Sequence, residues 1–331
     1  MISFIIIGYN EGWKLPKCID SIYSSIKYNN IKSSEVIYVD SKSTDDSIDI
    51  AKKYPLDKVL KITGETNAAI ARNAGALESK GDILFFIDGD MEIDPAFLGY
   101  VIDDDGNLMF DNVTGHLIDV FYDSEWDLMF ERPRTYSSTI PQSNQELLTQ
   151  GGVFVIKREA WEDVKGMRTK YTRNQDRDLS LRLREKGFKT IRIPHLIVRH
   201  HTIDYRNKTR MWKMFWSGKT LYPSVLIRDH FMNLEFLIRE VRSLYTTLAF
   251  IIFLVSLLLP SPVWKCSLTI YLIILLIRVC ANAKKAGTNK DKVLIQYFIE
   301  RIFYQILRDV SFIIAFFLYY PKNKQVLYIT C

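Results

Sequence analysis

The first quarter of the chain alternates between short apolar runs and longer amphipathic stretches. The apolar runs are rich in Ile, Val and Phe, which favours buried strands, and the stretches between them repeat apolar residues at helical spacing. The predicted strands are residues 2–7, 35–39, 59–62 and 83–87, and the predicted helices are residues 13–28, a segment that begins at Ile48, and residues 67–78. Strands joined by such helices form right-handed βαβ units, so the sequence predicts an α/β fold with a mostly parallel sheet and helices on both faces.

Polar side chains follow three of these predicted strands. Tyr9 and Glu11 come after the first strand, Asp40 ends the second and Asp88 follows the fourth. In sheets of this kind, ligands bind beyond the carboxyl ends of the strands. These residues therefore predict a binding site at one edge of the sheet.

The triplet Asp88-Gly89-Asp90 favours a metal at that edge. Because strand residues alternate between faces, the two carboxylates point the same way and can hold a hard divalent cation, which neutralises a pyrophosphate. The other interpretation is an acidic turn after a buried strand, because Asp-Gly is a common turn pair. The triplet alone leaves both interpretations open.

Six short motifs follow one another in an order that resembles the family 2 glycosyltransferases, which have the GT-A fold. The motifs are Ile5–Glu11, Val39–Asp45, Ala71–Gly75, Phe86–Asp90, Gly151–Trp161 and Asn174–Arg184. Each motif alone is weak, but six in the family's order are specific, and together they cover roughly residues 1–205. The resemblance implies a GT-A (Rossmann-like) domain that transfers a sugar from a nucleoside-diphosphate donor.

The resemblance also implies which side chains hold the donor, a UDP- or GDP-sugar. Asp40 would hydrogen-bond the base or ribose, with Tyr9 and Glu11 packed beside it. Arg72 opens a helical stretch and would lie near the phosphates, where a cation is physically sensible. A purely structural salt bridge is an equally good interpretation of Arg72.

For the metal, the resemblance implies that Asp90 is the direct ligand of Mg²⁺ or Mn²⁺ and that Asp88 reaches the ribose or a metal-bound water. The metal would offset the charge that develops on the departing nucleoside diphosphate. His200 or His201 would add a third metal contact, as a histidine does in some relatives. A structural role for both histidines fits the sequence equally well.

The resemblance assigns the general base to Asp176, where the family usually has Glu-Asp and this chain has Gln175-Asp176. A carboxylate beside the acceptor hydroxyl removes its proton during a single inverting displacement. Alternatively, Asp176 only caps a helix. Gly151 and Gly152 would bring backbone close to the donor sugar and acceptor, or form an ordinary turn. Asp178 is expected to point elsewhere and to serve solubility.

Beyond residue 243 the chain becomes strongly apolar, which raises the hydrophobic content of the whole sequence to 48%. Residues 244–260 and 263–281 are each long enough to cross a thin hydrocarbon core, with a Pro-Ser-Pro turn between them. Residues 293–320 are first amphipathic and then apolar, so they form an amphipathic or re-entrant helix or a third span. Basic residues on both flanks predict that both flanks lie in the cytoplasm.

Charge and cysteine content narrow the partners further. The formal net charge is +6, and basic residues are dense from Lys157 to Arg228, which suits an anionic membrane surface or a phosphate-bearing substrate. No nucleic-acid-binding motif accompanies this charge, so no nucleic-acid partner is expected. The four cysteines lie far apart and form no zinc-site or disulfide pattern, which fits a reduced compartment.

We therefore expect a cytoplasm-facing GT-A domain at residues 1–230, with a basic and aromatic interfacial linker at 206–230, followed by a multi-pass membrane region at 231–331. The expected reaction is inverting transfer of a sugar to a lipid-linked or membrane-delivered acceptor, in surface polysaccharide or glycolipid assembly. Two alternatives stay open. One is a polyprenyl-phosphate glycosyltransferase of the dolichol-phosphate-mannose type, whose anionic acceptor needs little base assistance. The other is a non-catalytic membrane scaffold that keeps the fold.

Overall fold

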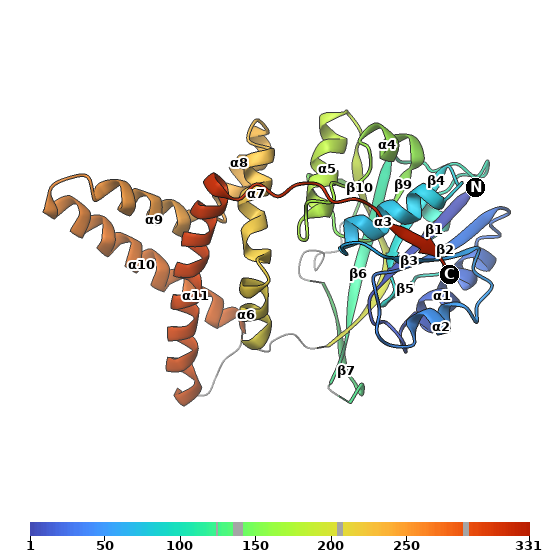
Figure 1. The fold of residues 1–331 in the computed structure, drawn as a ribbon, viewed down its shortest axis with the longest axis horizontal. Helices are drawn as coiled ribbons and strands as arrows, with labels where there is room; N and C mark the ends of the chain where they lie inside the picture. Colours follow the sequence, from blue (N-terminus) through green and yellow to red (C-terminus); the bar gives the residue numbers. More distant parts are fainter. Residues whose placement is uncertain (124, 135–141, 204–207, 287–290) are drawn as a thin grey trace. The chain divides into compact units, whose positions relative to one another are not determined.

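The computed structural model describes residues 1–123, 125–134, 142–203, 208–286 and 291–331. The chain separates into two compact units (Figure 1). The first, called the sheet domain below, holds Met1–Asn207 and Pro321–Cys331, and the second, the helical unit, holds Lys208–Tyr320. The structure thus divides the chain at residue 207 and not at 230, and it returns the last residues to the first unit.

The first half of the sheet domain follows the predicted alternation. Its elements are β1 (Ile2–Gly8), α1 (Leu15–Tyr28), β2 (Ser34–Asp40), α2 (Ser47–Ala51), β3 (Lys58–Ile62), α3 (Ala68–Glu78) and β4 (Ile83–Asp88). The four strands are parallel, in the order β3-β2-β1-β4. Gly8 pairs with Asp40 and Ile7 pairs with Asp88, so the carboxyl ends of three strands meet at one edge.

The second half of the domain extends the sheet with mixed pairings. Its elements are β5 (Met91–Ile93), η1 (Phe97–Tyr100), β6 (Asn112–Tyr122), β7 (Leu128–Pro133), β8 (Gln145–Glu146), β9 (Phe154–Lys157), α4 (Arg158–Asp163), α5 (Gln175–Glu185) and β10 (Thr190–Ile203). β9 is antiparallel to both β4 and β6, whereas β6 and β10 are parallel. The apolar pattern predicts the strands of this half less well than those of the first.

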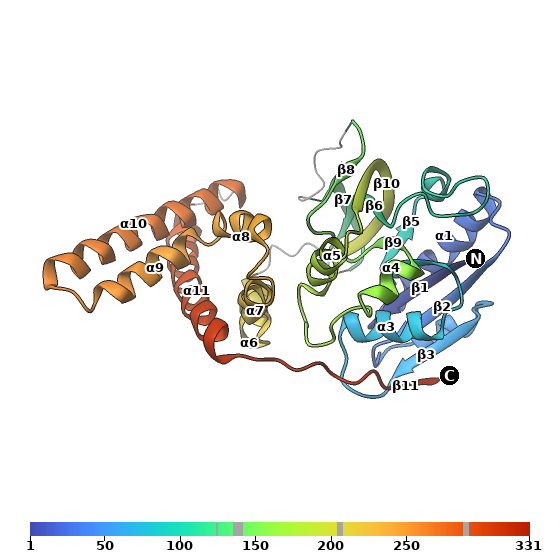
Figure 2. The same cartoon turned by 90° about the horizontal axis from the view of Figure 1, so that it is seen from above.

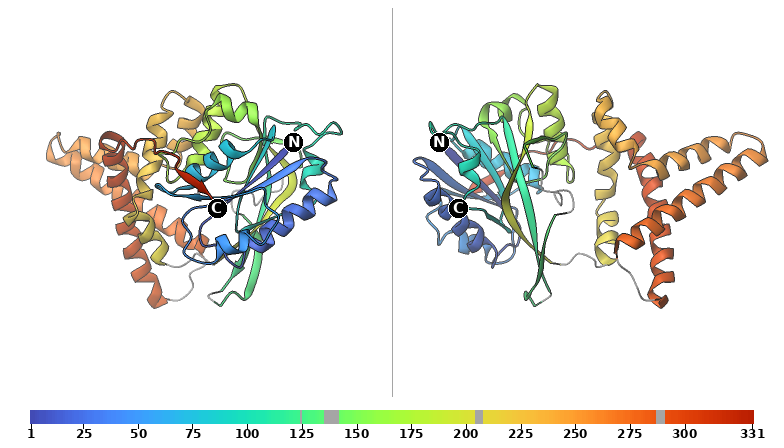
Figure 3. Two further views of the ribbon diagram at one scale, coloured as in Figure 1. Left: turned by 45° about the vertical axis from the view of Figure 1, so that its right-hand side comes forward. Right: turned by 180° about the vertical axis from the view of Figure 1, so that it is seen from behind.

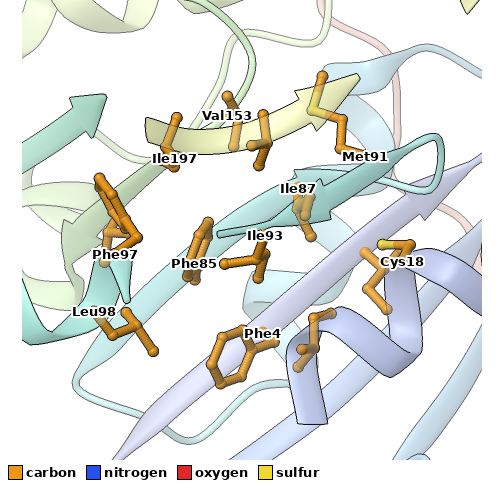
Figure 4. Packing of buried hydrophobic residues seen from close by; sticks show 14 of the residues in the cluster. Phe4, Cys18, Phe85, Ile87, Met91, Ile93, Phe97, Leu98, Val153 and Ile197 are labelled. Atoms are coloured by element: carbon orange, nitrogen blue, oxygen red, sulfur yellow. The ribbon is translucent and has the colours of Figure 1, made fainter. Parts of the chain in front are cut away.

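Helices lie on both faces of the sheet (Figure 2), and a cluster of buried apolar side chains fills the space on each face. On one face α1 and η1 pack against Phe4, Phe85 and Ile87, which are fully buried (Figure 4). On the other face α3, α4 and α5 cover a second cluster that contains Phe86 and Phe154. Burial of such side chains is worth roughly 1.5–3 kcal/mol each, and it makes the sheet a rigid support for the loops at its edge.

The C-terminal strand β11 (Tyr328–Thr330) completes this sheet by pairing antiparallel with β3 (Figure 3). Thr169 Oγ1 donates to the carbonyl oxygen of Lys324 and accepts its N–H, both at 2.7 Å. Tyr328 adds a hydrogen bond from its hydroxyl to Glu78 Oε1 at 2.9 Å. Residues on either side of the helical unit therefore belong to one folded domain.

The helical unit is built of α6 (Lys208–Trp216), η3 (Lys219–Leu221), α7 (Tyr222–Asp229), α8 (Leu234–Val241), α9 (Tyr245–Ser256), α10 (Ser261–Ala286) and α11 (Asp291–Leu318). Arg228 Nη1 donates to the carbonyl oxygens of Phe316 and Tyr319 at the end of α11, where a cation is favourable. Asp309 of α11 is fully buried and accepts hydrogen bonds from Thr247 at 2.7 Å and from Gln305 at 2.9 Å.

Among the described residues, one helix is long and apolar enough to cross a membrane, at Ser261–Asn282 within α10. The first predicted span, 244–260, contains the helix α9, which is shorter. Residues 293–318 of the predicted segment 293–320 lie within the single helix α11, which ends at Leu318.

Candidate active site

A cavity of about 510 Å³ opens at the predicted edge of the sheet. Tyr9, Glu11, Asp88 and Asp90 line it, as the strand ends led us to expect. The loop after β2 and the start of α3 supply the rest of the wall, which includes Ser41, Lys42, Thr66, Asn67 and Ala68. The cavity is large enough for a small-molecule ligand.

Asp40 belongs to the same edge but does not line the cavity. Its side chain is fully buried and accepts a hydrogen bond from the backbone N–H of Ser43 at 2.9 Å. Its other oxygen lies 3.3 Å from the hydroxyl of Tyr38. In this structure Asp40 therefore shapes the loop after β2, and its contact with a nucleotide stays a prediction.

Arg72 joins three parts of the site. From α3 it donates Nη2 to Asp88 Oδ1 at 2.6 Å and to the carbonyl oxygen of Gly152 at 2.9 Å. Its side chain is only 2% exposed, and its Nε and Nη1 have no hydrogen-bond partner among the described residues. Buried donors without partners are costly, and a phosphate would satisfy them. Burial raises the pKa of Asp88, although Arg72 acts to lower it.

Gly152 is required by this arrangement. A Cβ atom at position 152 would lie 2.7 Å from Arg72 Nη2 and 3.7 Å from Asp88 Oδ2. The backbone of the Gly151-Gly152 loop thus approaches the site as closely as the absence of a side chain permits.

Asp90 is held from the other side by β10. His200 Nε2 lies 3.3 Å from Asp90 Oδ2, and His200 Nδ1 lies 2.8 Å from Asp119 Oδ1 on β6. Burial acts to raise the pKa of Asp90, but His200 and Lys14 hold it below the ordinary value. Burial would lower the pKa of His200, but its hydrogen bonds to Asp119 and Asp90 outweigh burial and raise it.

Glu11 and Lys14 form an ion pair in the turn before α1, and Lys14 Nζ also lies 3.9 Å from Asp90 Oδ2. Burial and the neighbouring Asp90 raise the pKa of Glu11 to about 7, against the opposing effect of Lys14. The carboxylates of Glu11, Asp88 and Asp90 therefore all line the cavity. Lys14 and Arg72 balance only part of their negative charge. Such crowding of like charge is typical of a site that binds a cation.

The residues present fit a divalent metal in part. Asp90 Oδ1 is buried and has no hydrogen-bond partner in the described part of the chain, so it is available as a ligand. The described residues contain no preformed cluster of three or more His, Cys, Asp or Glu ligands. Mg²⁺ is usually bound through one or two carboxylates, with substrate phosphates and waters completing its shell. Asp88 and Asp90 meet that requirement.

Asp176 lies in the first turn of α5, after Asn174, which begins the helix with a left-handed backbone at φ 68°. Burial raises the pKa of Asp176, and the positive charge of Arg72 acts to lower it. The same guanidinium acts to lower the pKa of Asp88. The backbone N–H of Gln150 donates to Ser180 Oγ at 3.1 Å, and Ser180 Oγ donates to the carbonyl oxygen of Asp176 at 2.9 Å. Asp176 and the glycine loop are therefore linked through Ser180.

The expectation for Asp178 was wrong. Its side chain is fully buried and forms ion pairs with Arg182 at 2.9 Å and Arg168 at 3.1 Å. Arg182 in turn donates to the carbonyl oxygen of Gly166 at 2.8 Å. Asp178 thus fixes the loop before α5, which a solvated carboxylate could not do.

The two histidines separate on the alternating faces of β10. His200 adjoins Asp90, whereas His201 Nε2 lies 2.7 Å from Glu92 and its Nδ1 shares a hydrogen bond with the hydroxyl of Tyr122 at 2.8 Å. Of the two predicted metal contacts, His200 places its side chain beside the Asp90 carboxylate, whereas His201 meets Asp90 through its backbone N–H, which donates to the Asp90 carbonyl oxygen at 2.8 Å.

Comparison with known proteins agrees with this geometry. The sequence profile described as glycosyl transferase family 2 matches residues 3–169, which is half of the chain. The chain belongs to glycosyl transferase family 2. Its sheet domain has the mixed α/β sheet with helices on both faces that the resemblance implied.

Several curated glycosyltransferases are similar to it. An uncharacterized glycosyltransferase of Haemophilus influenzae is 29% identical over 198 residues, which covers 55% of this chain and 62% of that protein. Glycosyltransferase AglE of Haloferax volcanii is 33% identical over 97 residues, covering 27% and 30%. The UDP-Glc:alpha-D-GlcNAc-diphosphoundecaprenol beta-1,3-glucosyltransferase WfaP of Escherichia coli is 33% identical over 95 residues, covering 27% and 35%. The matched regions thus span between 30% and 62% of these relatives.

Solved structures with a partial likeness include S. aureus TarS in complex with UDP-GlcNAc and GalNAc-T7 with UDP, GalNAc and Mn²⁺. TarS has a TM-score of 0.45 at 16% identity, covering 60% of this chain and 58% of TarS. GalNAc-T7 has a TM-score of 0.48 at 18% identity, covering 63% and 44%.

Several residues of this candidate site were not predicted from the sequence. Lys14, Asp119 and Arg134 complete the charge network, with Arg134 Nη2 2.6 Å from Asp119 Oδ1. Lys14 had a signal in its position three residues after Glu11, at the start of a helix. Asp119 had a weaker one, as a charged residue inside an apolar strand.

Proposed function

We propose that this glycosyltransferase transfers a sugar with inversion from a nucleoside-diphosphate sugar to a lipid-linked acceptor. The donor would occupy the cavity of about 510 Å³ beside Tyr9 and Glu11. Asp88 and Asp90 would hold a divalent cation, Mg²⁺ or Mn²⁺, which offsets the charge on the departing nucleoside diphosphate. The free donors of Arg72 would bind a phosphate oxygen.

The observation that carries the proposal is the position of Arg72. It touches Asp88 and Gly152 directly, and its charge acts on Asp176 as well. Asp88, which would hold the metal beside the leaving diphosphate, and Asp176, the candidate base, therefore both interact with the Arg72 guanidinium. Asp176, kept from full solvation, would accept the proton of the acceptor hydroxyl as its oxygen attacks the anomeric carbon. A single displacement of this kind needs no second nucleophile.

The acceptor class rests on the membrane character of the chain and on a relative. WfaP, by its name, transfers glucose to a GlcNAc-diphosphoundecaprenol, and it is 33% identical over 95 residues. A lipid-linked sugar is delivered at the bilayer, where a membrane-bound enzyme meets it. The role in surface polysaccharide or glycolipid assembly follows from that acceptor class.

The proposed attachment is an α9–α10 hairpin in the bilayer, with both ends on the cytoplasmic side. Ile252, Leu258 and Ile277 are 63%, 87% and 61% exposed along it, which is unfavourable in water and suits lipid. α10 contains the candidate span Ser261–Asn282. Basic residues flank the hairpin in the sequence, which favours the cytoplasm for both ends.

The test uses the full-length protein in detergent, a panel of UDP- and GDP-sugars, Mn²⁺ or Mg²⁺, and a membrane lipid extract as acceptor. Release of nucleoside diphosphate and labelling of lipid are measured for the wild type, Asp90→Asn and Asp176→Asn, with Asp104→Asn as the control. Asp104 is an exposed acid on a loop away from the cavity.

We expect metal-dependent transfer from one donor, lost in Asp90→Asn and Asp176→Asn and kept in Asp104→Asn. Full activity of Asp176→Asn with a polyprenyl phosphate would instead support a polyprenyl-phosphate glycosyltransferase. No transfer from any donor by a folded protein would support the scaffold interpretation.

A further inference from the structure

Two partly exposed indoles, Trp13 and Trp126, meet at the surface of the sheet domain, and the buried ring of Tyr122 packs against both. Trp13 comes from the turn before α1, Tyr122 from the end of β6, and Trp126 from the connection between β6 and β7. The ring centroids of Trp13 and Trp126 are 4.8 Å apart, and those of Trp13 and Tyr122 are 5.2 Å apart. Trp13 and Trp126 are 36% and 40% exposed, and none of the three belongs to the two main core clusters.

The backbone at Trp126 is held in an unusual conformation. Its φ is +68°, in the left-handed region that bulky residues seldom adopt. Asp123 maintains the turn, because its Oδ1 accepts the N–H groups of Glu125 at 2.8 Å and Asp127 at 2.9 Å. Strain of this kind persists where surrounding contacts enforce it, and it is concentrated at ligand-binding sites. The result is an indole fixed against Trp13 at the surface.

This cluster adjoins the candidate active site through Lys14. The ammonium of Lys14 lies 5.8 Å from the Trp126 ring centroid and 3.9 Å from Asp90 Oδ2. On the other side, His201 packs edge-on against Trp13 and follows His200, which contacts Asp90. The rings do not line the donor cavity, so they flank the proposed metal site outside the space assigned to the donor.

We propose that the indoles of Trp13 and Trp126, supported by the buried ring of Tyr122, form an aromatic platform that binds a sugar ring of the acceptor, an inference that rests on the proposed transfer to a lipid-linked sugar. The electron-rich face of an aromatic ring packs well against the C–H face of a pyranose. Exposed rings beside a few polar groups are what a small-ligand site requires, and Lys17 Nζ, 5.3 Å from the Trp13 ring centroid, supplies one such group.

The charges around the platform favour a sugar over a bare lipid chain as its occupant. Lys14 and Lys17 each lie over one of the indoles, and Glu92 pairs with His201 beside them. These groups can hydrogen-bond the hydroxyls of a sugar or the phosphate that carries it. An alkyl chain could form no hydrogen bond with any of them.

The experiment measures the acceptor KM at saturating donor for Trp13→Ala, Trp126→Ala and Trp126→Phe. The acceptor is the lipid-linked sugar that is active in the assay above, used with its natural lipid and with that lipid replaced by a short soluble chain. Tyr28→Ala is the control, since Tyr28 is 68% exposed at the far end of α1. Donor KM, slow hydrolysis of the donor without acceptor, and melting temperature are followed in parallel.

We expect each alanine variant to raise the acceptor KM about tenfold or more with both acceptor forms, since one stacking contact is worth on the order of a tenfold change. Donor KM, donor hydrolysis and melting should stay close to wild type, Trp126→Phe should keep most of the affinity, and Tyr28→Ala should change nothing. An unchanged acceptor KM in an active protein overturns the inference alone. A rise seen only with the long lipid overturns it too, because the rings would then contact lipid. An inactive wild type overturns the proposed function and this inference together.

Discussion

Arg72 and Asp88 are joined by an ion pair of 2.6 Å in which the guanidinium is almost completely buried. Since the same Nη2 also donates to Gly152, the position of Asp88 depends on a side chain from α3 and a backbone atom from the glycine loop. We expect Arg72→Lys to lower kcat/KM about 100-fold, because a lysine keeps the charge but cannot reproduce the fork of donors. Arg158→Lys is the matched control. Arg158 is a partly buried arginine that donates to Gly81 and Ser79, beyond the other end of the strands, so this variant should lose stability without losing activity.

Gly152→Ala tests the same contact from the other partner. A methyl group 2.7 Å from Arg72 Nη2 would force the guanidinium away from Asp88. We expect activity to fall as far as it does in Arg72→Lys, while the double variant loses little more than the worse single variant, because both changes break one unit. Steady-state kinetics of the three variants provide the test. Fully additive losses would show that Gly152 acts independently of Arg72.

The raised pKa of Asp176 predicts opposite effects on activity and on stability. A general base must be ionised, so kcat/KM should increase as the pH rises through a pKa above the ordinary value of 3.8. A carboxyl whose folded pKa is raised lowers the stability of the fold once the pH exceeds that pKa. Asp176→Asn should therefore abolish transfer, by 100-fold or more, and also raise the melting temperature at pH 7.

The stability gain of Asp176→Asn should disappear as the pH falls below 3.8, where the carboxyl is protonated in both the folded and the unfolded state. Melting curves across this pH range, recorded beside Asp104→Asn, provide the measurement. A loss of stability at pH 7 in Asp176→Asn would mean that the carboxylate supports the fold, and the pH argument would then be wrong.

His200 gives a pH dependence of the opposite sign. Its raised pKa means that protonated His200, paired with Asp90 and Asp119, stabilises the fold below pH 6.5 and that this contribution is lost as the pH rises through the folded pKa. In the presence of EDTA, His200→Asn should cost about 1.5–3 kcal/mol at pH 6, typical of a charged hydrogen bond, and clearly less at pH 9. Thermal unfolding at both pH values checks this. An equal cost at the two values would indicate that His200 is neutral in the folded protein.

The sequence predicted the elements that depend on local pattern. The runs that became β1 to β4 are apolar and separated by amphipathic stretches, and side chains at the ends of parallel strands necessarily share an edge, so Tyr9, Glu11 and Asp88 could be placed together in advance. The same reasoning found Asp90. The reasoning was less successful for Asp40. This residue lies at the predicted edge of the sheet, but its side chain is buried against the backbone N–H of Ser43 and does not line the cavity.

The remaining features depend on contacts between distant segments. Asp178 is buried because Arg168 and Arg182 approach it, and no periodicity reveals such a pairing. The apolar run at residues 153–156 predicts the strand that became β9, but its antiparallel position beside β4 depends on pairing, and the short terminal strand β11 is fixed only by its pairing with β3. Trp13 and Trp126 meet only because β6 and β7 carry their connection to the start of α1.

The pairing of β11 with β3 restricts how the helical unit can meet a membrane. Since the chain leaves the sheet domain before residue 208 and rejoins the same sheet at Tyr328, any full crossings between these points must be even in number. One helix alone, the α10 span, would give an odd number. If α10 crosses the bilayer, as proposed above, a partner crossing is needed, and the apolar stretch of α9 and the leucines that follow it is the candidate. The α9 helix covers about 18 Å, and Leu257, Leu258 and Leu259 extend its apolar length.

This topology predicts which side of the membrane each end of the hairpin faces. In a background with Cys266→Ser and Cys280→Ser, a membrane-impermeant maleimide should label Cys331 only in inside-out vesicles, because Cys331 follows β11 in the sheet domain. The additional variant Ser261→Cys, at the turn between α9 and α10, should be labelled only in intact cells. Labelling of both positions from the cytoplasmic side would mean that the hairpin enters and leaves the bilayer without crossing it, which still satisfies the even count. Labelling of Cys331 from outside would contradict the pairing of β11 with a cytoplasmic sheet, because a strand cannot lie across the membrane from the sheet it completes.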